Sequence, residues 1–143
     1  MQVRRWRFAI LISLAATATS FCVTSAAAAM GSPHINVQPN NVMVNTSIAL
    51  TGVRFRANST FTIKECSTTA WIAPQNPCSS NNAISVTTNK RGRFHASLKA
   101  DVCANGQRGK EPTSVICYVG KPQPTGVDTI ALVGAAKITV TYP

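Results

Sequence analysis

Short alternations of apolar and polar residues run along the chain from residue 34 to its last residues, and no stretch there shows the period of an amphipathic helix. Alternation of period two is typical of strands that bury one face. The pattern predicts seven strands, centred on Ile35 and Val37, Ile48 and Leu50, Phe61 and Ile63, Ile84 and Val86, Phe94 and Leu98, Val115 and Val119, and Ile138 and Val140. We therefore expect an all-β domain, a seven-stranded immunoglobulin-like antiparallel β-sandwich whose two sheets bury their apolar faces against each other.

Turn residues separate the predicted strands. The sequence Pro39-Asn40-Asn41 predicts a turn, and Asn89-Lys90-Arg91-Gly92 predicts the turn of a hairpin over residues 84–98, because Gly92 can take the positive φ that such a turn requires. Three longer segments, 67–82, 100–112 and 121–134, are predicted as loops. Binding residues are most often found in loops of this length on a rigid β scaffold.

The N-terminus has the three parts of a secretory signal peptide. Three arginines in the first seven residues precede a short apolar stretch, 8–16, and a run of four alanines ends at Ala29. The apolar stretch is shorter than the roughly 20 residues that a membrane span needs. We predict a signal peptide over residues 1–29, cleaved near Ala28 or Ala29, and a single secreted domain over 30–143. An uncleaved N-terminal anchor is the alternative.

Four cysteines follow the predicted leader: Cys66, Cys78, Cys103 and Cys117. An even number in a small exported domain indicates two disulfides. Short loops close at the least entropic cost, which favours the local pairs Cys66–Cys78 and Cys103–Cys117. Strand parity puts Cys66 on the face opposite Ile63, so it should point outward, away from the core. A bridge from Cys66 to Cys117 through the core, as in antibody domains, is the alternative.

Several segments together resemble the neocarzinostatin apoprotein family. They are Ile35-x-Val37-x-Pro39, Ile48-Ala49-Leu50-Thr51-Gly52-x-x-Phe55, Phe61-x-Ile63-x-Glu65-Cys66, Val86-Thr87-Thr88-Asn89-x-x-Gly92-x-Phe94-x-Ala96-Ser97-Leu98, Cys117-Tyr118-Val119-Gly120 and Ala136-Lys137-Ile138-Thr139-Val140. The resemblance covers nearly the whole of residues 30–143. It implies a sandwich with a side ribbon that forms a cleft, and two local disulfides.

The resemblance also implies a function. Members of this family are secreted, non-catalytic proteins that sequester an apolar small molecule, an enediyne chromophore, with an antibacterial or DNA-directed role. A disulfide forms part of the cleft floor, here Cys66–Cys78, and Trp71 would supply an aromatic wall. The ligand-binding residues implied in this chain are Glu65, Cys66, Trp71, Cys78, Tyr118 and Gly120. We expect a monomer with no cofactor.

The charge balance suggests a second function. The chain has 14 lysines and arginines against four acidic residues, a net charge of +10. Five cations in two predicted turns are candidate anion-binding residues: Arg54, Arg56, Lys90, Arg91 and Arg93. The alternative function is therefore a basic secreted module that binds DNA, acidic polymers or a cell-surface partner. The competing interpretation is a solvated surface that keeps the domain soluble.

The residues give little support for catalysis or metal binding. His95 lies on the polar face of a predicted strand, and no Gly-x-Ser-x-Gly sequence is present. His34 and His95 do not stand at ligand spacing from a cysteine pair. We expect no catalytic residues, no metal site and no enzymatic activity.

Overall fold

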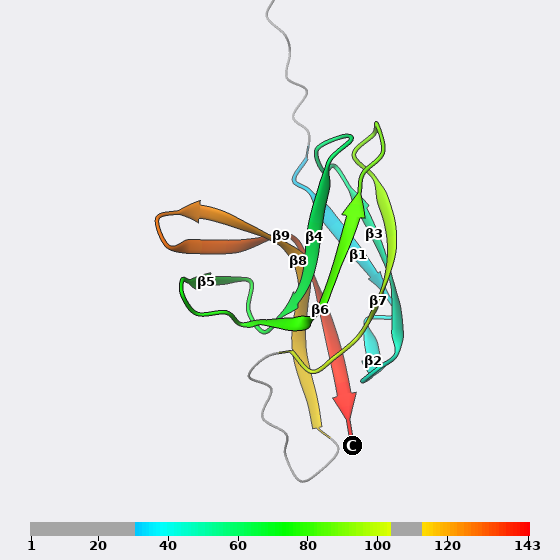
Figure 1. The fold of residues 1–143 in the computed structure, drawn as a ribbon. Coiled ribbons are helices and arrows are strands. Elements are labelled where there is room, and N and C mark those ends of the chain that lie inside the picture. The colour runs from blue at the N-terminus through cyan, green and yellow to red at the C-terminus, as the bar shows by residue number, and fades with distance from the viewer. Residues whose placement is uncertain (1–30, 104–112) are drawn as a thin grey trace, which may run out of the picture.

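The computed structural model describes residues 31–103 and 113–143, and these residues form nine strands in two sheets (Figure 1). The predicted signal peptide and residues 104–112 of the predicted loop lie outside them. The strands are β1 (His34–Gln38), β2 (Asn41–Met43), β3 (Ser47–Val53), β4 (Thr60–Cys66), β5 (Ala70–Ile72), β6 (Cys78–Thr87), β7 (Phe94–Lys99), β8 (Thr113–Gly126) and β9 (Thr129–Tyr142). The prediction of an all-β domain is confirmed.

One sheet has the strand order β1-β3-β7, and the other has the order β2-β9-β8-β4-β6, with β5 paired to β9. The alternating residues behave as their pattern predicts, because Ile35 and Val37 in β1 are buried while their neighbours are exposed. The main apolar cluster draws on both sheets, so the sheets bury a shared core. Its fully buried members include Ile48, Ile63 and Ile138.

The seven predicted strands correspond to seven of the nine that the described residues form, and β2 and β5 were not predicted. Asn41, expected in a turn, is the first residue of β2. This short strand runs parallel to β9, with Val42 opposite Val140, and buries Val42 in the core. Three residues with a single buried side chain are too few to show a period in the sequence.

The predicted hairpin over residues 84–98 is wrong. Strand β6 pairs with β4 in one sheet, with Val86 opposite Phe61, whereas β7 pairs with β3 in the other. The connection between β6 and β7 therefore crosses from sheet to sheet. The turn itself is present, because Gly92 has a φ of 67° and its N–H donates to the carbonyl oxygen of Asn89 at 3.0 Å.

Gly92 also joins this turn to the connection between β3 and β4. Its carbonyl oxygen accepts a hydrogen bond of 3.1 Å from the Phe55 N–H, and a Cβ added to Gly92 would overlap the carbonyl oxygen of Phe55. We expect Gly92→Ala to lower the free energy of unfolding by about 2 kcal/mol or more, through overlap and the strained positive φ. Urea unfolding at neutral pH measures this loss.

Gly126→Ala is the matched control. An added Cβ at Gly126 meets only the hydroxyl of Thr129, a side chain that can turn away, and no positive φ is required there. We expect the control to lose less than about 1 kcal/mol. Equal losses in the two variants would contradict this explanation of Gly92.

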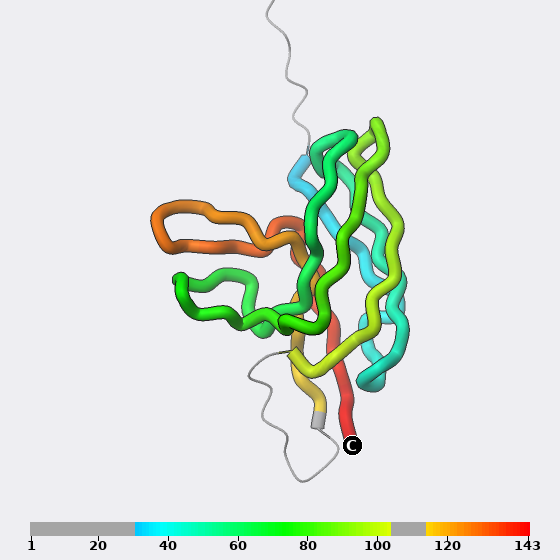
Figure 2. Tube along the Cα trace, viewed as in Figure 1, coloured from blue at the N-terminus to red at the C-terminus, as the bar shows by residue number. Residues whose placement is uncertain are grey.

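Segment 121–134, predicted as a loop, is a two-stranded ribbon formed by the outer halves of β8 and β9. The ribbon leaves the sandwich where the register of β8 shifts between Val119 and Lys121 and where Gly134 has a φ of 70°. Strand β5 pairs with the outer part of β9, and the tube in Figure 2 shows the ribbon and the β5 segment projecting together from one side of the sandwich. The sequence resemblance implies such a ribbon.

Both predicted disulfides are present, Cys66–Cys78 and Cys103–Cys117, so the alternative bridge between Cys66 and Cys117 is wrong. The parity argument is confirmed in part. Cys66 does lie outside the main core, but it is fully buried rather than exposed. It forms a second, small apolar cluster with Cys78 and Leu132, and the ribbon covers this cluster.

Candidate functional site: a groove under the ribbon

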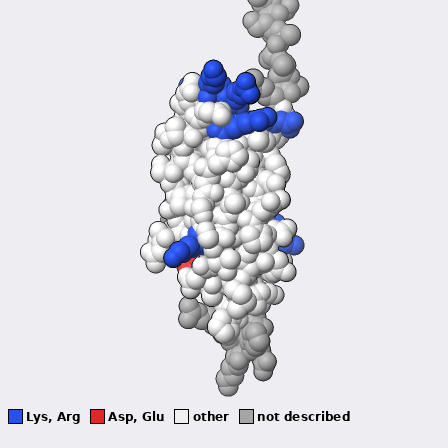
Figure 3. All heavy atoms as spheres, turned by 90° about the vertical axis from the view of Figure 1, so that its right-hand side faces the viewer, with Lys and Arg blue, Asp and Glu red and all other residues white. Residues whose placement is uncertain are grey.

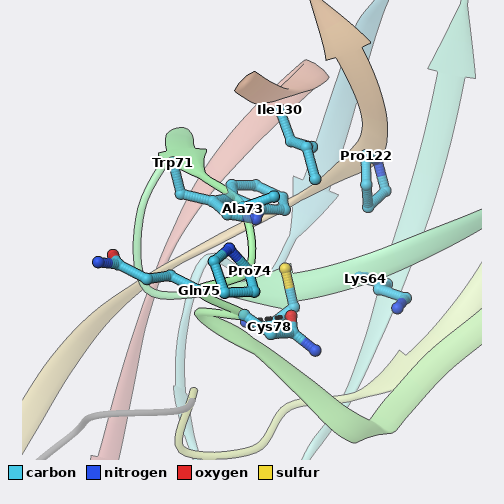
Figure 4. Close-up of a pocket in the computed structure, with 9 residues that line it drawn as sticks. Lys64, Trp71, Ala73, Pro74, Gln75, Cys78, Pro122 and Ile130 are labelled. Carbon is cyan, nitrogen blue, oxygen red and sulfur yellow. Dashed lines mark hydrogen bonds between the residues drawn. The ribbon is translucent and has the colours of Figure 1, made fainter. Parts of the chain in front are cut away.

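A groove of about 260 Å³ lies between the ribbon, the β5 segment and the six-stranded sheet (Figure 4). Its walls are formed by residues of β4 and β6, of the segment that contains β5, and of the ribbon. The lining residues are Lys64, Trp71, Ala73, Pro74, Gln75, Asn76, Cys78, Pro122 and Ile130. The groove therefore lies directly beside the Cys66–Cys78 disulfide.

Backbone pairing fixes the tryptophan wall of the groove. Trp71 in β5 stands opposite Ile130 in β9, and its half-buried side chain packs on the second cluster around Cys66 and Cys78. The chain after β5 is tied to the ribbon by a hydrogen bond of 2.6 Å from the Ala73 N–H to the Asp128 carbonyl oxygen. The pairing fixes the backbone that carries the indole, and the packing on the second cluster positions its ring.

The base of the segment that joins β4 to β6 and contains β5 is closed by hydrogen bonds. The Ser67 N–H donates to the carbonyl oxygen of Pro77 at 3.0 Å, and the Cys78 N–H donates to the side-chain oxygen of Asn76 at 3.2 Å. These bonds and the disulfide bring the two ends of the connection together. The walls of the groove are thereby attached to β4 and β6 of the sandwich.

The groove combines an apolar wall with one cation. Trp71 and Ile130 lie on one side, and Lys64 lies on the other side of Cys78 (Figure 4). Neither the buried Glu65 nor any other acidic residue of the described ranges lines it. An aromatic ring could therefore contact Trp71 while a polar or acidic group of the same molecule reached Lys64.

Two of the six ligand-binding residues implied by the sequence, Trp71 and Cys78, line the groove. Cys66 and Tyr118 belong to the packed cluster of which Trp71 is also a part. Gly120 is buried in β8, where an added Cβ would come within 2.9 Å of the Leu132 Cβ. The absence of a side chain at Gly120 therefore lets β9 approach β8 closely.

Glu65, the sixth of these residues, does not line the groove. Its side chain is fully buried, and its Oε2 accepts hydrogen bonds from the side-chain amide of Asn82 and from the Asp101 N–H, the latter at 3.1 Å. Its Oε1 has no hydrogen-bond partner among the described residues. Burial raises the pKa of the Glu65 carboxyl from 4.5 to about 7, although both hydrogen bonds lower it.

Several lining residues were not predicted from the sequence, namely Lys64, Ala73, Pro74, Gln75, Asn76, Pro122 and Ile130. Lys64 carried a usable signal, because it shares strand parity with Cys66 two residues later. Pro122 and Ile130 lie in the segment expected to be a loop. Their approach to Trp71 depends on strand pairing between β5 and β9, which no local pattern shows.

The five predicted anion-binding cations gather at one end of the sandwich (Figure 3). Arg54 and Arg56 lie in the β3–β4 connection, and Lys90, Arg91 and Arg93 lie in the β6–β7 connection. Both connections are hydrogen-bonded to each other. We call this set of five residues the basic end.

The part of the chain that the structure describes contains neither a metal-binding cluster nor a membrane-spanning helix. No group of three or more histidine, cysteine, aspartate or glutamate side chains in ranges 31–103 and 113–143 is placed to hold a metal ion. In the same ranges no helix is long and apolar enough to cross a membrane.

The fold and the groove define the class of protein: a disulfide-linked, two-sheet β domain whose side ribbon overhangs a small, mostly apolar groove. No protein-family model and no curated protein matches the chain. Among solved structures, macromomycin is similar over 78% of this chain and 100% of its own, with a TM-score of 0.48 and 16% sequence identity. Macromomycin is an apoprotein of the neocarzinostatin family, the family that the sequence resembles.

Proposed function

We propose that this protein is a secreted, non-catalytic binding protein that holds an apolar small molecule in the groove under the ribbon. The observation that carries the proposal is the position of Trp71, which is half-buried beside the Cys66–Cys78 disulfide and paired with Ile130 on the same side of the groove. Binding sites for small molecules are usually concave and mainly apolar, with a few polar groups that orient the ligand. The groove has this composition.

The size of the groove limits what it can hold. Its volume of about 260 Å³ lies below the range of roughly 300–1,000 Å³ that is common for ligand sites. We expect it to enclose a fused ring system, while the rest of a larger molecule stays outside. An enediyne-like chromophore with an aromatic substituent is one ligand class of this kind, and it would give the protein an antibacterial or DNA-directed role.

Two disulfides are compatible with an extracellular location, where such bonds persist. Together with the signal-peptide pattern over residues 1–29, they support secretion. The immunoglobulin-like arrangement and the monomeric state expected from the sequence belong to the same proposal.

Fluorescence of Trp71 tests the proposal, since the chain has two tryptophans and the other is in the predicted signal peptide. We expect 2-naphthoic acid, a fused aromatic carboxylate, to quench the emission of oxidised protein at micromolar concentrations. Trp71→Ala should weaken binding about tenfold, measured by equilibrium dialysis, because an aromatic contact contributes about 1 kcal/mol beyond its buried area. No quenching up to 100 μM by this acid or its amide would contradict the proposal.

Lys64→Met examines the polar side of the groove. We expect it to weaken binding of 2-naphthoic acid about tenfold and to affect 2-naphthamide much less, because only the carboxylate forms an ion pair with the ammonium group. Lys137→Met, an exposed lysine of β9 that does not line the groove, is the matched control. Equal effects of the two substitutions would mean that net charge, and not Lys64, attracts the ligand.

A further inference from the structure

We propose that the basic end is a second binding site, for the phosphate backbone of nucleic acid. Its five cations, Arg54, Arg56, Lys90, Arg91 and Arg93, are all exposed and lie together at one end of the molecule (Figure 3). None of them lines the groove. The two sites are therefore separate, and each can be tested without the other.

Hydrogen bonds hold the two connections of the basic end in one arrangement. The Phe55 N–H donates to the Gly92 carbonyl oxygen at 3.1 Å, and the Asn58 N–H donates to the Asn89 carbonyl oxygen at 3.2 Å. The buried hydroxyl of Thr88 donates to the carbonyl oxygen of Arg56 at 2.6 Å. The backbone under the cations is thus fixed before a polyanion binds, which reduces the entropy lost on binding.

The turn that carries three of the cations is further stabilised by Asn89. Its side-chain oxygen accepts hydrogen bonds from the Arg91 N–H at 2.8 Å and the Arg93 N–H at 3.1 Å. Both bonds use backbone donors, so the two guanidinium groups remain available. Substitution of the arginine side chains should therefore leave the turn intact.

No acidic residue offsets the charge of the basic end within the described ranges. Glu65 is buried, Asp101 follows β7 at the opposite end of that strand from Arg93, and Asp128 lies at the tip of the ribbon. No ion pair involving the five cations occurs in these ranges. Cations that are clustered and uncompensated produce a local positive potential that attracts polyanions and accelerates their encounter.

The residue types at the basic end favour phosphate. Four of the five cations are arginines, whose planar guanidinium groups match phosphate oxygens with two parallel hydrogen bonds. Of the three rings packed together nearby, Phe55 and Phe94 are buried, and the half-buried Phe61 has the Lys121 Nζ over its face at 5.1 Å from the ring centroid. No aromatic ring of the described residues is exposed at the basic end as a platform on which bases could stack. We therefore expect contact with the backbone alone, without sequence preference.

The test uses a fluorescein-labelled 20-base-pair DNA of mixed sequence and anisotropy titrations between 25 and 200 mM NaCl. Five phosphate contacts would give a slope of log Kobs against log salt of about −4.5 at most. Arg91→Gln/Arg93→Gln should reduce the magnitude of this slope by about 2 and weaken binding at least tenfold at 50 mM NaCl. Binding of 2-naphthoic acid should not change, since it concerns the groove.

Lys99→Gln/Lys137→Gln is the matched control, because it removes the same charge from exposed residues outside the basic end. We expect its DNA affinity to stay within about threefold of wild type. Equal losses in the two double variants would overturn the proposal, as would no DNA binding at 25 mM NaCl.

Two competitors test the class of polyanion. The proposal is wrong if heparin, at equal charge concentration, binds tenfold more tightly than the duplex, since the site would then prefer an acidic polysaccharide. It is also wrong if single-stranded DNA of the same length binds tenfold more tightly, since that would indicate stacking of bases. Failure of these DNA experiments leaves the small-molecule proposal unaffected.

Discussion

We expect Cys66→Ala/Cys78→Ala to lower the free energy of unfolding by about 3 kcal/mol and to abolish binding of aromatic ligands in the groove. The bond closes a loop with a sequence separation of 12, and a cross-link of this length removes about that much conformational free energy from the unfolded chain. Loss of the two buried sulfurs also removes the packing on which Trp71 rests. Guanidinium unfolding and quenching of Trp71 fluorescence measure the two effects.

The second disulfide provides the matched control. Cys103 and Cys117 have a sequence separation of 14, so removing both should cost a similar free energy of unfolding. They belong to the main core and do not line the groove. We therefore expect Cys103→Ala/Cys117→Ala to retain ligand binding at temperatures where it is folded. If both double variants lose binding alike while folded, the first disulfide has no special role in shaping the groove.

We expect ionisation of Glu65 to lower the free energy of unfolding by about as much as the loss of one disulfide. Burial raises the pKa of its carboxyl from 4.5 to about 7 in the folded protein. Below pH 4.5 the group is protonated in both states, and its contribution to stability is complete. Between pH 4.5 and 7 the unfolded state ionises first, so the free energy of unfolding falls by about 3 kcal/mol, and above pH 7 the fall ends. Urea titrations at pH 4.5, 6 and 8 measure it.

Glu65→Gln should abolish this fall and make the protein more stable than wild type at pH 8, because the neutral amide requires no buried charge. Asp128→Asn is the control. It replaces a carboxylate at an exposed position with a φ of 60°, which asparagine tolerates. We expect the control to keep the pH profile of wild type. A Glu65→Gln variant that still loses about 3 kcal/mol over this range would place the titrating group elsewhere.

The sequence predicted correctly which residues are buried in the strands that have one apolar face. Ile35, Ile48 and Ile63 are fully buried because a strand of period two can direct only one set of side chains to the core. The same parity disfavoured the bridge from Cys66 to Cys117, which the structure then ruled out. These predictions succeeded because each depends on the local chain alone.

The errors concern which strands pair. The sequence around Gly92 reverses the chain, but a reversal looks the same whether the next strand pairs with the previous one or joins the opposite sheet. The ribbon was hidden by Pro122 and Pro124, which normally argue against a strand. Both lie in the outer half of β8, which pairs only with β9, so their missing N–H groups cost no ladder bond on the free edge.

Only the part of the groove that lies within one short disulfide loop was predicted from the sequence. The family resemblance implied Trp71 and Cys78 as cleft residues, and both belong to the loop closed by one disulfide. Ile130 lies almost sixty residues beyond Trp71 in the sequence and reaches it only through the antiparallel register of β5 and β9. Glu65 was assigned to the cleft by its position before Cys66. Successive residues of a strand point to opposite faces, and the carboxyl therefore lies on the core side.

The separation of the two apolar clusters has an evolutionary consequence. Trp71 and Leu132 belong to the small cluster under the ribbon, and the larger cluster between the sheets includes neither. Substitutions of residues such as Leu132 can thus alter ligand preference while the larger cluster between the sheets keeps its own packing. A scaffold divided in this way can diversify its specificity through mutations that selection for stability does not remove.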